Sequence, residues 1–271
     1  MDDIQNRSLR RTVDEVEHGY GERVHVLADP VARTLLARLG APGPVQPEYT
    51  RLVELLYDRL LDAVIIHGFP SDYRAVPTRV ANHHPGTTLD GELLSRHVAV
   101  AIGAVARAGS VAGQRCYRRL TELFDPAGIR LDHLWMNRHT SAMGKLPSVD
   151  YHGSKTGGSI DGRILLIPEP IAATGATVRY TLDVFDKEVG GAAARRIALH
   201  LVITPEYLRD VVLPDPGLEV FTLRVDRGLS DPDVLATRPG THLDRERGLD
   251  DQRRIVPGIG TLGDLLNNCF V

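Results

Sequence analysis

The chain is poor in lysine and cysteine and has no long hydrophobic run, and each shortage excludes a class of protein. Its 32 basic residues are almost all arginine, and the net charge of −3 over 271 residues argues against a protein built to coat nucleic acid. Two cysteines, Cys116 and Cys269, provide no disulfide framework and fit a reducing compartment. No apolar run approaches the roughly 20 residues that span a membrane. The polar start of the chain lacks the apolar core of a signal peptide. We therefore expect a cytoplasmic protein with no nucleic-acid or membrane partner.

Apolar runs alternate with amphipathic stretches along most of the chain. Buried strands are expected at residues 98–106, 129–136, 164–167, 197–203 and 218–225. Helices are expected at residues 31–39, 48–67 and 110–124 and from residue 178 onward. Alternation of this kind is typical of an α/β fold, a parallel sheet with helices on both faces. Ligands of such sheets bind at the carboxyl ends of the strands.

The remaining segments suggest how the domain is bounded. Residues 1–23 are charged and weakly periodic and are interpreted as an N-terminal arm, which leaves residues 24–271 as the domain. Turn residues within 76–94 indicate a hairpin region. Residues 137–160 are polar and rich in glycine and serine, so they form an unusually long loop or hairpin that is a candidate lid. Trp135, at the end of a strand, is expected in the core.

One stretch combines three features that favour phosphate binding. Residues 163–177 have the sequence RILLIPEPIAATGAT: a buried apolar run, the acidic Glu169, and a loop of small residues that leads into a helix. Free backbone N–H groups and the positive end of a helix dipole meet at such a place. The hydroxyls of Thr174 and Thr177 add donors. The plainer alternative is an ordinary strand-to-helix connection capped by threonine.

Two further loops are expected at the same edge of the sheet. Arg107, Ala108 and Gly109 directly follow the strand at 98–106. Residues 255–264, with the sequence IVPGIGTLGD, are dense in glycine, so their backbone can approach a ligand closely.

Taken together, these motifs resemble the uracil phosphoribosyltransferase family, a branch of the type I phosphoribosyltransferases. Residues 169–177 (EPIAATGAT, the donor loop) resemble the family's Asp-Pro-Met-Leu-Ala-Thr-Gly-Gly-Ser. Residues 106–109 (the pyrophosphate loop) resemble its Leu-Arg-Ala-Gly, and residues 204–206 its Ala-Pro-Glu. Residues 255–264 (the acceptor loop) resemble its Ile-Val-Pro-Gly-Leu-Gly-Asp-Ala-Gly-Asp. The four motifs occur in the same order as in the family. The resemblance extends from about residue 24 to the C-terminus.

The resemblance implies a type I phosphoribosyltransferase fold and 5-phosphoribosyl pyrophosphate (PRPP) as the donor. The donor loop would hold the 5-phosphate, Glu169 the ribose hydroxyls, and Arg107 and Arg138 the pyrophosphate. The implied PRPP-binding residues are Arg107, Ala108, Gly109, Arg138, Glu169, Ala173, Thr174, Gly175, Ala176 and Thr177. Mg²⁺ would bind mainly through PRPP and pyrophosphate, with no direct protein ligand. The family is usually dimeric or larger, which implies a homodimer or higher homo-oligomer.

The departures from the family lie at the acceptor end. Arg254 replaces a tyrosine, Thr261 replaces an aspartate, and residues 231–253 form a polar insertion where the family has a short turn. Glu169 is one methylene longer than the family's aspartate. The implied catalytic residues are Glu169, Arg107 and Asp264, and the implied acceptor-binding residues are Arg254, Ile255, Gly260, Thr261, Leu262 and Asp264.

Three functions remain open at this point. The departures favour phosphoribosyl transfer to a small-molecule acceptor other than uracil, as in a specialised or antibiotic pathway. The first alternative is a divergent uracil phosphoribosyltransferase that makes UMP for pyrimidine salvage and holds the base mostly by backbone. The second is a non-catalytic nucleotide sensor with a phosphoribosyltransferase-like fold, suggested by the loss of an acidic residue at Thr261.

Overall fold

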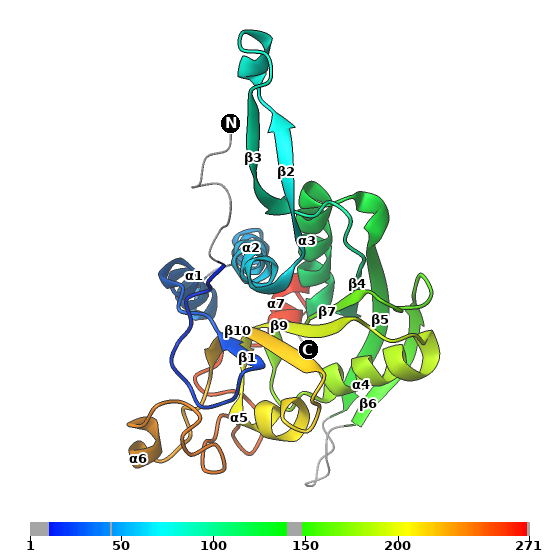
Figure 1. Ribbon diagram of the computed structural model, residues 1–271. Helices are drawn as coiled ribbons and strands as arrows, with labels where there is room; N and C mark the ends of the chain where they lie inside the picture. The colour runs from blue at the N-terminus through cyan, green and yellow to red at the C-terminus, as the bar shows by residue number, and fades with distance from the viewer. Residues whose placement is uncertain (1–10, 44, 140–147, 270–271) are drawn as a thin grey trace.

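The computed structural model contains a twisted, mainly parallel sheet with helices on both faces (Figure 1). It describes residues 11–43, 45–139 and 148–269, and the side chains of 137–139 and 148–149 lie outside that description. In sheet order the strands are β1 (Val24–Val26), β10 (Leu218–Val225), β9 (Arg195–Ile203), β7 (Ile164–Pro168), β4 (Val100–Ala106), β5 (Ile129–His139) and β6 (Ser148–Lys155). Strand β8 (Ile171–Ala172) also pairs with β9. Only the β5–β6 pair is antiparallel among these described strands.

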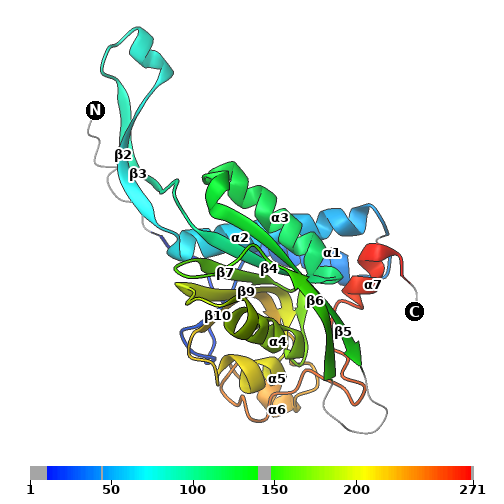
Figure 2. The same cartoon turned by 90° about the vertical axis from the view of Figure 1, so that its right-hand side faces the viewer.

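Each face of the sheet is covered by its own helices (Figures 1 and 2). On one face lie α1 (Pro30–Gly40), α2 (Glu48–Gly68) and α3 (Ala108–Leu123). On the other lie α4 (Ala176–Val184), α5 (Pro205–Tyr207) and the single π-helical turns η4 (Phe185–Val189) and η5 (Leu208–Val212). The shorter elements are η2 (Arg79–Asn82), η3 (Pro126–Gly128), α6 (Pro232–Leu235) and α7 (Leu262–Asn267). The prediction of a parallel α/β fold with helices on both faces is confirmed.

Strand alternation explains why the apolar runs are continuous. Ile102 and Leu166 point into the core beneath α2 and α3, whereas their neighbours Ala101 and Leu165 point into the core beneath α4. A strand buried on both faces needs apolar residues at every position. Each such leucine or isoleucine stabilises the fold by about 1.5–3 kcal/mol relative to an exposed side chain.

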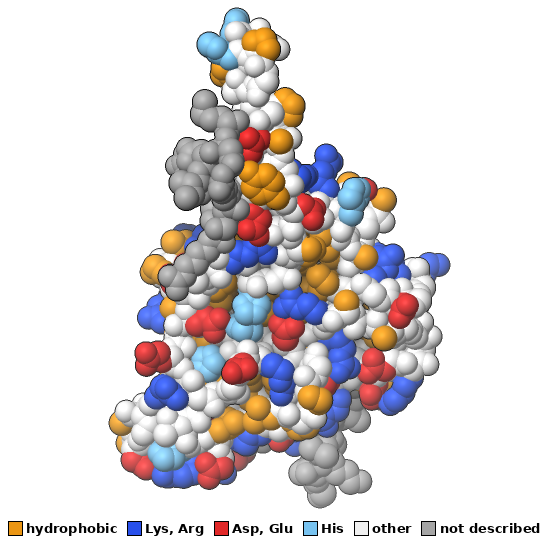
Figure 3. All heavy atoms as spheres, in the orientation of Figure 1, with side chains coloured by type: hydrophobic (Ala, Val, Ile, Leu, Met, Phe, Trp, Pro, Cys, Tyr) orange, Lys and Arg blue, Asp and Glu red, His pale blue; other side chains and the backbone are white. Residues whose placement is uncertain are grey.

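The predicted hairpin region is a long two-stranded ribbon that projects from the body. Strand β2 (Ser71–Pro77) pairs with β3 (Thr88–Leu94) in antiparallel register, so the hairpin begins earlier than residue 76. Figures 1 and 2 show it standing clear of the sheet. Hydrophobic side chains are exposed along it (Figure 3), namely Tyr73, Val76, Val80 and Leu89.

Much of the candidate lid, residues 137–160, belongs to a hairpin arm of the main sheet. β5 continues to His139, and β6 returns antiparallel to it from Ser148. Residues 140–147 lie outside the described part, and the lid role stays a prediction. The expectation of a buried Trp135 is wrong, since its exposed fraction is 47%. Because its neighbours Leu134 and Met136 point into the core, strand alternation turns Trp135 to the opposite face.

The N-terminal segment and the polar insertion pack against each other. Tyr20 donates a hydrogen bond from its hydroxyl to Glu246 Oε2 at 2.7 Å, and Gly19 N donates to Pro239 O at 2.7 Å. Glu246 is fully buried, and its Oε1 accepts from Arg227 Nη1 at 2.9 Å and from Gly240 N at 2.7 Å. A buried carboxylate is tolerated when it is paired and hydrogen-bonded in this way.

Within the described residues, no helix combines the length and the apolar character that crossing a membrane requires.

Candidate functional site

Strand order places a ligand-binding edge between β4 and β7. From β4 the chain moves outward to β5 and β6 and then returns to the other side of β4 as β7. Parallel sheets bind ligands at the carboxyl ends of the strands where the order reverses like this. These ends carry Arg107 and Glu169. A methyl group added to Gly109 would lie 3.2 Å from Pro168 O and 3.6 Å from Glu169 Oε2, so the two loops touch.

A hollow lies at the carboxyl end of β7, and the donor loop forms its wall. It is lined by Glu169, Ile171, Ala172, Ala173, Thr174, Gly175, Ala176, Thr177 and Val178. Glu169 is buried, with 5% of its surface exposed. The N-terminus of α4 opens into the same place, because Gly175 is its N-cap. Small side chains, N–H groups at a helix N-terminus and threonine hydroxyls make this hollow suitable for an anion.

Gly175 is the residue that shapes the donor loop. Its φ of +72° lies in the left-handed region that favours glycine. A Cβ at this position would lie 2.2 Å from Tyr207 Cδ2 and 2.6 Å from Val211 Cγ2. Both the backbone angle and the space therefore exclude any side chain, which explains a glycine at this position.

Three buried residues in and between β9 and α5 support the donor loop through hydrogen bonds. Thr204 Oγ1 donates to Ala173 O at 2.6 Å, and His200 Nδ1 donates to Glu169 O at 2.5 Å. His200 Nε2 then accepts from the Tyr207 hydroxyl at 3.1 Å, since a carbonyl at Nδ1 fixes the tautomer. Complete burial lowers the pKa of His200 to about 4, so the ring is neutral at physiological pH.

Sequence reasoning missed two of these supporting residues. Thr204 was recognised as part of a motif, whereas His200 and Tyr207 were not singled out. A histidine within the apolar run of residues 197–203 is a usable signal, because a buried imidazole needs hydrogen-bond partners.

The pyrophosphate loop and the acceptor loop meet in an ion pair. Arg107 Nη2 lies 2.5 Å from Asp264 Oδ1, and both side chains are partly exposed. The peptide bond between Ala106 and Arg107 is cis. Gly263 lies against Ala108, since a Cβ added to Gly263 would be 3.9 Å from Ala108 Cβ. The structure thus brings together Arg107, Ala108 and Asp264, three of the residues predicted from sequence.

The acceptor loop is held by two charged residues at the end of β10. Asp226, 2% exposed, accepts from Gly258 N at 2.8 Å and forms a bidentate pair with Arg224. Arg224 Nη2 also donates to Gly258 O at 3.0 Å. Gly260 has φ +83°, and Leu262 is buried at the start of α7, with Thr261 as the N-cap.

The insertion runs alongside the acceptor loop. Leu249 and Ile255 form an antiparallel bridge, and Val256 N donates to Gly248 O at 2.9 Å. Glu206 accepts from Gly248 N at 3.0 Å, which joins the insertion to α5. Arg254, whose side chain is 70% exposed, pairs with Asp250 at 2.7 Å.

Arg138 is the one predicted PRPP ligand that these contacts do not include. Its backbone pairs with Val149 in the β5–β6 hairpin. Its side chain lies outside the described part of the chain, so its predicted role stays a prediction.

Comparisons with known proteins establish the fold and leave the reaction open. No protein-family model matches the chain. The AQ2163 protein of Aquifex aeolicus is similar over 90% of this chain and 97% of its own, with a TM-score of 0.66 and 16% identity. That similarity shows a common fold.

Partial matches include named phosphoribosyltransferases. A purine phosphoribosyltransferase from Pyrococcus horikoshii has 16% identity over 61% of this chain and 82% of its own, with a TM-score of 0.35. A hypoxanthine phosphoribosyltransferase from Trypanosoma cruzi, complexed with the product IMP, has 15% identity over 70% and 84%, with a TM-score of 0.38. TM-scores this low do not establish a common fold.

Proposed function

We propose that this chain transfers the 5-phosphoribosyl group from PRPP to a small-molecule acceptor and releases pyrophosphate. The observation that carries the proposal is the hollow at the carboxyl end of β7, where Glu169 and the N-terminus of α4 face one place. It lies at the reversal point of the sheet, next to Arg107. A phosphate and a sugar with adjacent hydroxyls match an N–H cradle beside a carboxylate.

The residues would divide the reaction as follows. Backbone N–H groups of residues 173–177 bind the 5-phosphate, and the Glu169 carboxylate accepts from the ribose hydroxyls. As the bond to pyrophosphate breaks, the sugar ring gains positive charge, which Glu169 stabilises. Arg107 balances the negative charge of the leaving group. A nitrogen of the acceptor attacks the anomeric carbon from the opposite face, so most of the rate enhancement comes from positioning.

The Arg107–Asp264 pair would link the two substrates. Pyrophosphate competes with Asp264 for Arg107, because both are anions within reach of the same guanidinium. Arrival of PRPP would therefore release the Asp264 carboxylate to accept a proton or hydrogen bond from the acceptor. This exchange favours a sequence in which PRPP binds first.

Magnesium fits the donor set of this site. Among the described residues lining the hollow, Glu169 is the one carboxylate, and oxygen donors are what Mg²⁺ prefers. Bound mainly through PRPP and water, the ion supplies positive charge for the leaving pyrophosphate.

For the acceptor, we propose a compound other than uracil. The insertion contacts the acceptor loop at Leu249 and Gly248, and its Asp250 pairs with Arg254, which directly follows the insertion. A charged wall of this kind suits an acceptor larger or more polar than a free pyrimidine base. The alternatives are UMP synthesis and a non-catalytic sensor.

A negative charge introduced into the donor loop tests the proposed binding of PRPP. Thr174→Glu places a carboxylate in the hollow, and we expect PRPP affinity to fall at least about 100-fold because two anions repel at short range. Thr174→Ser, which keeps the hydroxyl, is the matched control. Calorimetric titration with PRPP and Mg²⁺ measures both. Equal affinity in the two variants would overturn the phosphate role of the loop.

An acceptor panel scored by pyrophosphate release separates the three functions. Rapid UMP formation from uracil would replace the altered-acceptor proposal with the first alternative. Tight PRPP binding without turnover on any acceptor would support the sensor. Glu169→Gln serves as the catalytic control, with an expected fall in turnover of about 100-fold or more.

A further inference from the structure

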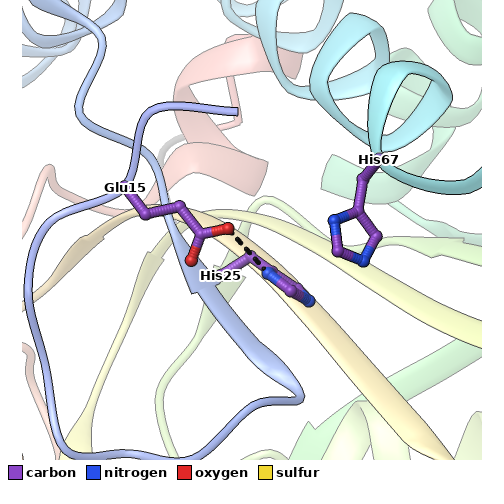
Figure 4. Close-up of side chains that lie close together, drawn as sticks. All are labelled: Glu15, His25 and His67. Atoms are coloured by element: carbon purple, nitrogen blue, oxygen red, sulfur yellow. Dashed lines mark hydrogen bonds and ion pairs between the residues drawn. The ribbon is translucent and has the colours of Figure 1, made fainter. Parts of the chain in front are cut away.

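A second cluster of ligand-type side chains lies outside the hollow, beside the edge strand β1. It consists of Glu15 from the N-terminal segment, His25 from β1 and His67 from the last turn of α2 (Figure 4). Helix α2 begins beside the acceptor loop, where Tyr49 contacts Ile259 O, and ends at this cluster. Its 21 residues separate the two places by roughly 30 Å.

The three side chains converge although they come from separate elements. His25 Nδ1 lies 2.9 Å from Glu15 Oε1, and the rings of His25 and His67 are 4.3 Å apart between centroids. One candidate ligand atom from each residue lies within 4.8 Å of those of the other two. Ligands of a tetrahedral zinc ion lie roughly 3.3 Å apart. The exposed side chains of Glu15 and His67 can close that difference by small rotations.

An aromatic side chain packs against both imidazoles. Phe221, fully buried on β10, is paired with His25 across the sheet, and its ring stacks on His25 at 4.3 Å. His67 meets the same ring edge-on at 5.4 Å. A binding site whose ligands are already oriented loses less entropy when it captures an ion.

The charges around the cluster also favour a cation. Two further charged side chains, Arg195 and Glu219, lie near His67. Arg195 pairs with Glu219 at 2.6 Å, so these two charges cancel. The Glu15 carboxylate therefore gives the cluster a net negative charge. A third histidine lies beside the cluster, with His18 Nε2 at 3.9 Å from Glu15 Oε2.

We propose that Glu15, His25 and His67 form a binding site for one divalent transition-metal ion, best matched by zinc. Two imidazoles and one carboxylate are a donor set that zinc binds with a fourth position left for water or a further ligand. Because the donors come from the N-terminal segment, β1 and α2, the ion ties that segment to the body. The site is independent of the proposed transfer reaction.

The test is a titration of the full-length, tag-free chain with Co²⁺, followed by visible absorption, and with Zn²⁺, followed by calorimetry. We expect one equivalent to bind. His67→Ala and Glu15→Gln should each weaken binding at least about tenfold. His97→Ala is the control, since His97 is 86% exposed and lies outside the cluster. Circular dichroism checks that each variant is folded, and the exposed position of both substituted residues favours this.

Amide exchange supplies a second readout that reports on the N-terminal segment. The amide of Val16 donates to Val26 O at 2.8 Å, next to the cluster. Zinc should slow its exchange in the unaltered chain and leave it unchanged in His67→Ala. Absence of saturable binding at equimolar metal would overturn the proposal. His83 and His84 lie between β2 and β3, at the end of the projecting ribbon. Binding that survives both substitutions, or that is lost when these two histidines are replaced, would also overturn the proposal.

Discussion

The donor loop and the acceptor loop are built in different ways, although both lie at the same edge of the sheet. The donor loop rests on the central strands, with His200, Thr204 and Tyr207 buried beneath it. The acceptor loop is held by the Arg224–Asp226 pair at the end of β10 and by contacts to the polar insertion.

This difference has a consequence for specificity. A change beneath the donor loop disturbs the core, so the loop can vary little. The acceptor loop and the insertion rest on a charged pair and on backbone contacts, so changes in their own residues disturb the apolar core less.

The largest effect is expected from Gly175→Val. The new side chain would overlap Tyr207 and Val211, and the positive φ adds backbone strain. Together these should lower the free energy of unfolding by about 2–5 kcal/mol. Chemical denaturation measures the loss. Gly190→Val is the control, because φ at Gly190 is +76° and nothing lies within 4 Å of the added Cβ. Backbone strain alone should cost about 1–3 kcal/mol there, and an equal loss at both sites would contradict the packing argument.

Acid should weaken the support beneath the donor loop. The pKa of His200 is about 4 in the folded chain and 6.5 in the unfolded one, so only the unfolded chain takes up this proton between those values. The contribution of His200 is therefore fully present above pH 6.5 and is lost as pH falls toward 4, by roughly 3 kcal/mol in all.

His200→Asn isolates this effect from other titrating groups. Asparagine can still donate to Glu169 O, but it does not titrate. Urea denaturation at a series of pH values should give the variant a flatter stability profile between pH 4 and 6.5. Parallel profiles for the two chains would show that another group is responsible.

A change beneath the acceptor loop should separate the two halves of the site. Asp226→Ala removes the acceptor of Gly258 N and the partner of Arg224, and we expect a loss of about 1.5–3 kcal/mol in unfolding free energy. Acceptor KM should rise while PRPP affinity stays unchanged. Asp183→Ala, which breaks a surface pair with Lys187, should cost less than about 1 kcal/mol. Equal loss of PRPP and acceptor binding would mean that the halves are not independent.

Asp264→Asn should have the smallest effect on stability. Its pair with Arg107 is partly exposed, so the unfolding free energy should change by less than about 1 kcal/mol. PRPP should bind at least as tightly, because Arg107 no longer has an anionic competitor. Turnover should fall by about 100-fold if Asp264 takes a proton from the acceptor. Steady-state kinetics with a working acceptor checks this, and unchanged turnover would remove Asp264 from the chemistry.

Local sequence patterns predicted most of the strands and helices of the fold. Largely apolar runs predicted β4, β7, β9 and β10, since burial on both faces leaves few polar positions. The prediction failed where burial depends on what covers a strand. Trp135 is apolar and lies within β5, yet it is exposed, because it points to the face opposite Leu134 and Met136 at a place that the core of that face does not cover. The sequence did not decide whether residues 137–160 form a loop or a hairpin, since a polar, glycine-rich segment is compatible with both.

The candidate site divides in the same way. The sequence alone determined the donor loop, because a strand, small residues and a helix start are contiguous and their chemistry is local. Only the tertiary structure decided that Arg107 pairs with Asp264, that His200 and Tyr207 support the loop, and that Glu15, His25 and His67 converge. These contacts join residues far apart in the chain, and their distances depend on strand order and packing rather than on any local pattern.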